Sequence, residues 1–328
     1  MTIAPYKYLI SDSLDNCGNI YINSAGVVNF DTILNFLFDE VKFAFEKEQG
    51  KSLDNINIEF IDSPLPYASI QNCFGDYTIS FSEGMKKLLY AFSFLCVIGY
   101  QYSCFLKVNP KNSKAWEIQL KIFYHIDELL NNFFIRKTYK FDLIAALQDL
   151  EICFVHSLQD WSYQAHEVFE GAIRFILSHE VGHIIEESHQ SKVQQEENAD
   201  KVAIQVLTNI CTFEKEDSSS PEYLKKLLDS DLYATYKAIN FTFFLFMLID
   251  IKQEEMQVYT PCCGMKDDEH PSAEHRSNQL IFSDEFWEFP SHKLFLKWRS
   301  SLIYVFAFLK GKIDSTNISG LKEKFEKF

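Results

Sequence analysis

The sequence has few basic residues for its size: 31 lysines and arginines stand against 46 acidic residues, which gives a formal net charge of −15 over 328 residues. Such a field repels phosphate, so it argues against nucleic acid as a partner. The eight cysteines include no C-x-x-C pair and no disulfide framework, which favours a reducing cytoplasm. The first ten residues also lack the continuous apolar run of a secretory signal, so we expect a cytoplasmic protein.

Apolar residues, in contrast, are abundant. They make up 47% of the chain, with 31 Phe and 16 Tyr, which predicts a packed globular protein. Residues 88–106 have the length of a membrane span, but polar residues interrupt this run, and the second apolar run, 238–251, is too short. We therefore predict two core helices and no membrane insertion.

The segment 176–185 carries the pattern H-E-x-x-H within an apolar stretch that is typical of a buried helix. His179 and His183 are four residues apart, so both imidazoles leave the same face of a helix and can bind one metal ion. Glu180 lies beside them, where its carboxylate can act as a general base on water. The pattern predicts a catalytic zinc site.

A third zinc ligand is expected from residues 195–200, which read Q-E-E-N-A-D. Two histidines and one carboxylate form a common catalytic zinc set. Glu196 is the preferred ligand, and Asp200 on the same helix face is expected to accept the N–H of a ligand histidine. Two alternatives remain open. His189 has the spacing of another class of zinc protease but lacks the glycine that this class needs, and Glu197 is one residue out of register.

The segment 267–276 adds the pattern H-P-x-x-x-x-R. Its histidine, His270, and its arginine, Arg276, could each reach the cleft and stabilise the oxyanion of a tetrahedral intermediate. A structural role, in which the guanidinium ties the loop to helix ends, is equally open for Arg276. The alternative for His270 is a surface position in a loop.

Taken in order, the three motifs resemble those of the gluzincin proteases and, more closely, those of the Lit family of bacterial phage-exclusion peptidases. The resemblance is specific at residues 178–189, 195–207 and 270–280, and weaker at 77–94 and 301–309. It implies a soluble zinc endopeptidase whose protein substrate is elongation factor Tu. It further implies that a phage-derived activator triggers the cleavage, which stops translation and aborts the infection.

Two other functions remain open. A sensor or binding protein in phage defence would hold zinc as a structural ion, but a closed structural site has no use for the carboxylate of Glu180. A zinc protease that acts on another protein, such as a repressor, would differ only in its substrate. The loop between His183 and Glu196 looks shorter than in the Lit family, which bears on substrate contacts more than on metal binding.

The predicted fold class is α+β: a mostly helical, gluzincin-like zincin with a small mixed sheet beside the H-E-x-x-H helix. Residues 57–61 and 76–81 alternate as strands. The second would suit the sheet edge on which a zinc protease pairs an extended substrate, and an ordinary core strand is the open alternative. Apolar spacing predicts helices at 30–50, 83–106, 114–135, 141–160, 161–190, 196–212, 221–230, 233–255 and 292–310.

We expect one metallopeptidase domain over residues 1–328. Its catalytic core spans 55–280, and the flanks 1–54 and 281–328 supply packing helices.

Overall fold

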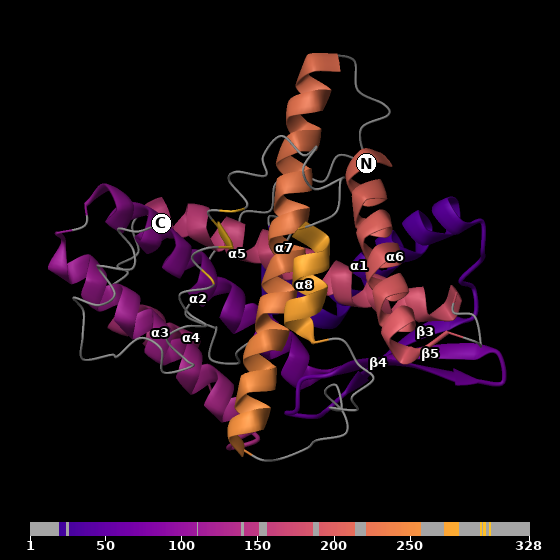
Figure 1. The fold of residues 1–328 in the computed structure, drawn as a ribbon, viewed down its shortest axis with the longest axis horizontal. Helices are drawn as coiled ribbons and strands as arrows, with labels where there is room; N and C mark the ends of the chain where they lie inside the picture. Colours follow the sequence, from indigo (N-terminus) through magenta and orange to yellow (C-terminus); the bar gives the residue numbers. More distant parts are fainter. Residues whose placement is uncertain are drawn as a thin grey trace.

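In the computed structural model, most of the chain forms helices packed around the helix that carries H-E-x-x-H, and a small sheet lies at one side (Figure 1). The predicted α+β class, mostly helical with a small mixed sheet, is confirmed. The structure describes residues 20–23, 26–109, 111–138, 141–150, 156–185, 190–213, 221–256 and 272–281, together with 296, 298, 299 and 302.

The strands form two separate sheets. Strands β1 (Ile20–Asn23) and β2 (Gly26–Asn29) pair with each other in antiparallel orientation. The second sheet contains β3 (Ile56–Ile61), β4 (Ala68–Cys73) and β5 (Asp76–Ser82) in the order β3-β5-β4. Because β3 runs parallel to β5 and β4 runs antiparallel to it, this sheet is mixed.

Among the described residues, β3 and β4 are the edge strands of the mixed sheet, so the expectation that residues 76–81 form the edge is wrong and the core-strand alternative holds. Strand β5, which contains those residues, lies in the middle with a partner on each side. The N–H of Ser82 donates to the carbonyl of Tyr67, and bonding residues alternate along an antiparallel ladder. The backbone groups of Ala68, Ile70 and Asn72 therefore point away from β5, toward the open edge.

The described helices agree with the predicted ones at most positions. Their bounds are α1 Phe30–Gln49, α2 Glu83–Val108, α3 Ser113–Phe134, α4 Leu143–Asp149, α5 His156–Gly182, η1 (a 3₁₀ turn) His183–Ile185, α6 Lys192–Phe213, α7 Pro221–Met256 and α8 Ala273–Ile281. The two helices predicted between 221 and 255 are one continuous helix, and α8 was not predicted. The helix predicted at 292–310 falls mostly outside the described residues.

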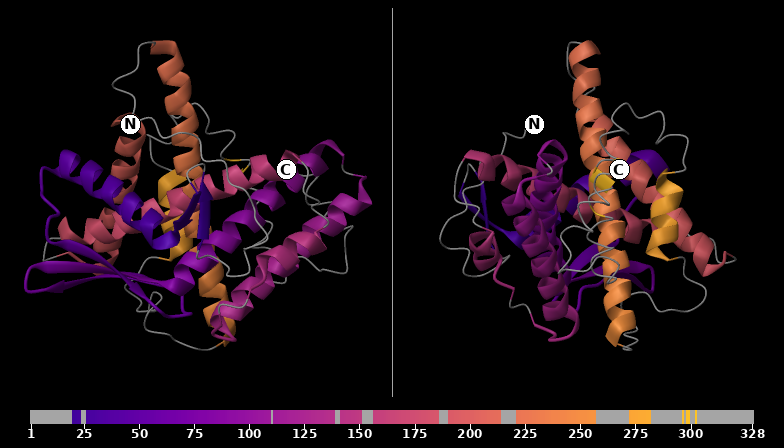
Figure 2. Two further views of the ribbon diagram at one scale, coloured as in Figure 1. Left: turned by 180° about the vertical axis from the view of Figure 1, so that it is seen from behind. Right: turned by 60° about the vertical axis from the view of Figure 1, so that its left-hand side comes forward.

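Helix α5 occupies the centre of the molecule and packs against α1, α2, α6 and α7 (Figure 2). Two helices are long and apolar enough to span a membrane by composition, over Glu83–Leu106 and Leu232–Lys252. Within the structure, 72% and 67% of their apolar windows are buried. Both segments therefore serve as core helices, as their interrupted apolar runs predict.

Ser82 connects the sheet to the helical layer. Its hydroxyl accepts the N–H of Met85 at 3.0 Å, which caps the first turn of α2. The same oxygen accepts the N–H of Tyr67 at 2.9 Å, at the residue just before β4. One buried side chain thus fixes where β5 ends, where α2 begins and where the edge strand enters the sheet.

Helices α5 and α7 approach closely at Gly171. A Cβ atom placed there would lie 2.5 Å from the Cβ of Ala238, closer than two carbon atoms can pack. At Gly99 in α2, a Cβ would meet only ordinary contacts, the nearest at 3.5 Å from Ile122. An added methyl group would therefore clash at Gly171 but fit at Gly99.

We expect Gly171→Ala to lower the free energy of unfolding by about 1–3 kcal/mol, because α5 and α7 must move apart. Gly99→Ala is the matched control and should raise it by about 0.5–1 kcal/mol, because alanine is the better helix former. Denaturant unfolding of both variants measures the difference. A Gly171→Ala variant as stable as the wild type would mean that the α5–α7 contact carries no packing energy.

Candidate metal centre

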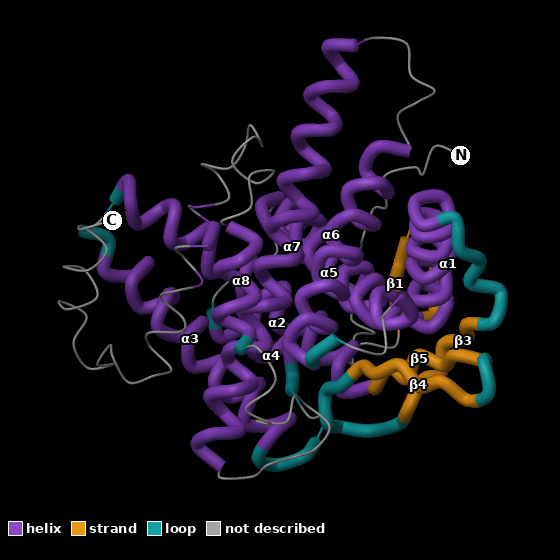
Figure 3. The backbone as a smooth tube through the Cα atoms, turned by 45° about the vertical axis from the view of Figure 1, so that its right-hand side comes forward, coloured by secondary structure: helices purple, strands orange, loops and turns teal. Residues whose placement is uncertain are grey.

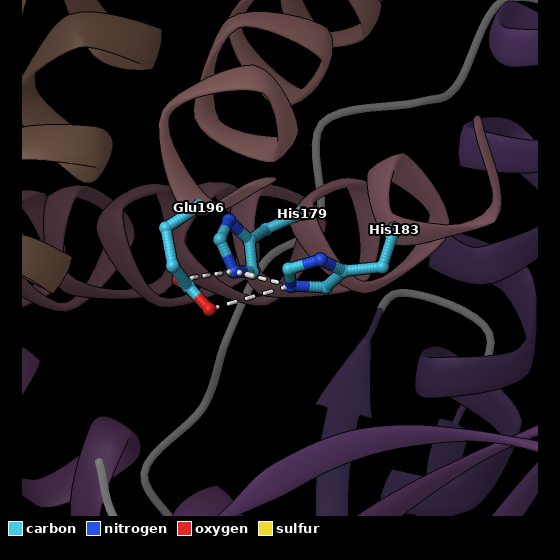
Figure 4. Close-up of side chains that lie close together, drawn as sticks. All are labelled: His179, His183 and Glu196. Carbon is cyan, nitrogen blue, oxygen red and sulfur yellow. Dashed lines mark hydrogen bonds and ion pairs between the residues drawn. The ribbon is translucent and has the colours of Figure 1, made fainter. Parts of the chain in front are cut away.

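Three side chains from two adjoining helical segments converge on one point: His179 at the end of α5, His183 in η1 and Glu196 in α6 (Figure 4). The Nε2 atoms of the two histidines are 3.1 Å apart. The carboxylate oxygens of Glu196 lie 3.3 Å from Nε2 of His179 and 3.8 Å from Nε2 of His183. One ligand atom from each residue lies within 4.8 Å of the other two, so the group can hold a metal ion.

The spacing of these atoms fits a tetrahedral ion with short bonds. Ligands at about 2.0–2.2 Å from a tetrahedral metal are separated from one another by about 3.3–3.6 Å. The two histidine nitrogens are 3.1 Å apart, and Oε2 and Oε1 of Glu196 lie 3.3 Å from His179 and 3.8 Å from His183, so the separations are close to this range. The two imidazole planes are nearly perpendicular, at 88°, so each ring presents a nitrogen edge without stacking on the other.

His179 is oriented from behind by a carboxylate. Its Nδ1 lies 2.9 Å from Oδ1 of Asp200, which leaves Nε2 to face the other two ligand atoms. Arg276 of α8 in turn donates to both oxygens of Asp200, from Nε at 2.7 Å and from a terminal nitrogen at 2.6 Å. The other terminal nitrogen lies 3.4 Å from Glu196. One guanidinium therefore positions both carboxylates of the site.

The carboxylates favour positive charge between the imidazoles. Burial lowers the pKa of His179, but the hydrogen bonds to Asp200 and Glu196 outweigh burial and raise it to about 9. Burial raises the pKa of Glu196, but His179, Arg276 and His183 outweigh it and lower the value to about 2. Asp200 follows the same logic: burial opposes the shift, and Arg276 and His179 hold its pKa below the usual range. A metal cation satisfies the same attraction as a proton.

Glu180 is buried beside the three candidate ligands, and β4 lies next to it. Burial raises the pKa of Glu180, while the nearby His179 and His183 oppose the increase. Its carboxylate also accepts the backbone N–H of Ile70 in β4. This bond places the edge strand β4 against the end of α5 that carries His179 and Glu180 (Figure 3).

The convergence of the two helices depends on small residues. A Cβ at Gly182 would lie 2.8 Å from the Cα of Ala199, so the backbones of α5 and α6 nearly touch at this point. The small side chain of Ala199 on α6 and the absence of one at Gly182 on α5 permit this close approach. An apolar cluster packs next to the site. The ring centroid of Phe243 in α7 lies 5.2 Å from that of Phe175 in α5 and 5.3 Å from the guanidinium carbon of Arg276.

The competing ligands are placed differently. Glu197 faces α8, where it accepts a hydrogen bond from Gln279 at 2.9 Å and lies 3.5 Å from His275. Helix α5 ends at Gly182, earlier than the predicted residue 190, and His189 lies outside the described residues. The same is true of His270, so its role at the oxyanion stays a prediction.

Sequence reasoning missed two contributors, β4 and α8. The run Ala68–Cys73 is too polar to stand out as a strand, although the following Phe74-Gly75 between alternating runs is a hairpin signal. The start of α8 did carry a local signal, because Ser272 caps the helix by accepting the N–H of His275 at 3.2 Å and Glu274 lies in its first turn. Its Arg276 reaches an aspartate 76 positions away in sequence, which no local pattern indicates. The guanidinium is engaged by carboxylates, which favours the structural alternative for this residue.

The fold and the site together define a mostly helical protein with a candidate metal centre, whose ligands come from the end of α5, from η1 and from α6. The sequence model of the family Peptidase U49 matches residues 79–283, more than half of the chain, so the chain belongs to this peptidase family. The matched segment begins within β5 and contains every described residue of the candidate metal centre. No curated protein and no solved structure matches the chain.

Neighbouring glutamates provide a test of the ligand set. We expect Glu196→Gln to weaken zinc binding by at least about 100-fold, since it removes a ligand and not only an outer partner. Glu197→Gln, the matched control, should bind zinc as the wild type does, because Glu197 faces Gln279 and His275. Competitive titration of each purified variant with a zinc-binding dye gives the affinities. Equal loss in both variants, or loss in Glu197→Gln alone, would contradict the assignment.

Proposed function

We propose that this peptidase is a zinc-dependent endopeptidase. The observation that carries the proposal is the convergence of His179, His183 and Glu196 with the buried carboxylate of Glu180 alongside. Two imidazoles and one carboxylate leave a fourth position of a tetrahedral ion for water or substrate, which is the pattern of catalytic rather than structural zinc. A site that only stabilised the fold would gain nothing from burying a further carboxylate at this place.

His179, His183 and Glu196 would hold the ion. Zinc bound there supplies a Lewis acid that polarises the scissile carbonyl and acidifies water. Glu180 then accepts a proton from the attacking water and returns it to the leaving amine, so that one carboxyl group serves first as base and then as acid. The raised pKa of Glu180 suits both halves of this transfer. Asp200 and Arg276 are positioning residues, because they act through His179 and Glu196.

The open edge of β4 is the place we propose for the substrate backbone. Extended peptides bind to sheet edges by adding a strand. The N–H and C=O groups of Ala68 and Asn72 and the C=O of Ile70 are directed outward, while the N–H of Ile70 bonds to Glu180. Ile70 touches Glu180, so a peptide paired with β4 lies beside the general base. The requirement for an extended segment favours a flexible loop of a protein as substrate.

The identity of that substrate rests on the resemblance to the Lit family. We propose elongation factor Tu as the substrate, a phage-derived product as the activator and the bacterial cytoplasm as the location. The thiols of Cys73, Cys96 and Cys104, none of which is in a disulfide, support a reducing compartment. Cleavage of a translation factor explains why such an enzyme would act only after infection, since constant activity would stop growth.

The test replaces the general base. We expect Glu180→Gln to bind zinc with unchanged stoichiometry and to lose peptidase turnover by about 10²–10⁴-fold, because the amide cannot accept the proton. New protein N-termini are compared by mass spectrometry in bacteria that express each variant, with and without phage infection. Glu170→Gln is the matched control, because it changes a half-buried glutamate on the same helix that pairs with Arg174, away from the ligands.

The outcomes separate chemistry from substrate. A new terminus in elongation factor Tu, seen after infection with the wild type and Glu170→Gln but absent with Glu180→Gln, supports the whole proposal. New termini in another protein, with the same dependence on Glu180, keep the zinc endopeptidase and discard the substrate. Cleavage that persists in Glu180→Gln refutes the role of Glu180, and zinc binding without any Glu180-dependent terminus favours a binding protein in phage defence.

A further inference from the structure

The turn between β4 and β5 exposes a phenylalanine where the backbone disfavours one. The loop has two residues, Phe74 and Gly75, whose φ angles are +57° and +98°. A type I′ turn requires positive φ at both positions and is usually built with Asn-Gly, because asparagine and glycine tolerate this region. The side chain of Asn72 already stabilises the turn by accepting the N–H of Gly75 at 3.0 Å. The turn therefore does not need an aromatic residue.

Phe74 also gains nothing from packing. Its relative exposure is 110%, more than in an extended reference peptide, and all six residues from Gln71 to Asp76 are exposed. The turn lies at the end of the hairpin opposite to the start of α2, at the outer edge of the molecule (Figures 2 and 3). Both the conformation and the exposure of this side chain oppose folding stability, which points to use in binding.

The position of the turn identifies what it would bind. Phe74 directly follows the strand whose Ile70 N–H touches Glu180, and four residues of an extended strand span about 13 Å. A substrate segment paired along β4 from Glu180 outward thus arrives at the exposed ring. Phe74 also lies outside the segment matched by the family model, which begins at residue 79.

We propose that Phe74 is an anchor for the protein substrate. Its ring inserts into an apolar site on the substrate surface, at the tip of the β4–β5 hairpin and away from the segment that is cleaved. This inference rests on the proposed function. The anchor adds affinity at a distance from the reacting bond, so it stabilises the bound substrate and the transition state equally. Loss of the ring should raise KM and leave kcat unchanged.

The variant Phe74→Asn separates this role from a structural one, because asparagine is favoured at this turn position. We expect it to be at least as resistant to thermal unfolding as the wild type. Its kcat/KM for purified elongation factor Tu, used as the probe with lysate from phage-infected cells as activator, should fall at least about tenfold through KM, since burying a phenylalanine is worth that much. Phe74→Trp should restore cleavage. Phe43→Gln, which removes another exposed phenylalanine from α1, is the matched control and should cleave as the wild type does.

Three results would overturn the anchor. A lower unfolding temperature of Phe74→Asn would assign the ring to the fold, whatever the activity. Equal kcat/KM for the wild type and Phe74→Asn would remove the anchor and leave the proposed endopeptidase intact. If the wild type cleaves elongation factor Tu no faster than Glu180→Gln does, the proposed substrate is refuted, and the anchor for that substrate is refuted with it.

Discussion

The centre of this molecule depends on a near contact between two helix backbones. Helices α5 and α6 can direct ligand atoms at one point because only a hydrogen and a methyl group separate them at Gly182 and Ala199. Glu196 lies one helical turn before Ala199, and His179 and His183 flank Gly182, so the contact fixes the distances within the triad. The packing of the two helices therefore sets the geometry of the candidate metal centre, and rigid helices hold that geometry more accurately than loops would.

Charge completes what packing begins. Asp200 and Glu196 share the single guanidinium of Arg276, so the three groups carry one excess negative charge next to the imidazoles. Arginine suits this task because its planar fork can face two carboxylates at once, whereas a lysine offers a single point of charge. Phe243 lies against the guanidinium and limits its contact with water, which strengthens the pairing. Helix α8, short and distant in sequence, is thus a structural part of the site.

The sequence predicts those parts of the site that depend on interactions between residues close together in the chain. His179 and His183, and likewise Glu196 and Asp200, were predictable because a spacing of four residues places each pair on one helix face, and the H-E-x-x-H pattern itself indicated Glu180. Arg276 was found but its role stayed open, since its partner lies in another element. The edge strand β4 was missed because its pairing with β5, not its own polar composition, makes it a strand. The continuity of α7 across residues 230–233 has a local cause: Ser230 and Asp231 disfavour a helix only weakly, and no glycine or proline stands there to end it.

An open sheet edge also has consequences for crowded solutions of this protein. Unpaired strand edges are templates on which a second copy can build a ladder, and self-association of this kind leads to aggregation. The bond between Ile70 and Glu180 occupies one of the outward N–H groups of β4, and α5 lies against the same part of the strand. The strand is only six residues long, so few outward groups remain for another molecule. Glu180, which we propose as the general base, thus also limits strand pairing between two molecules of this protein.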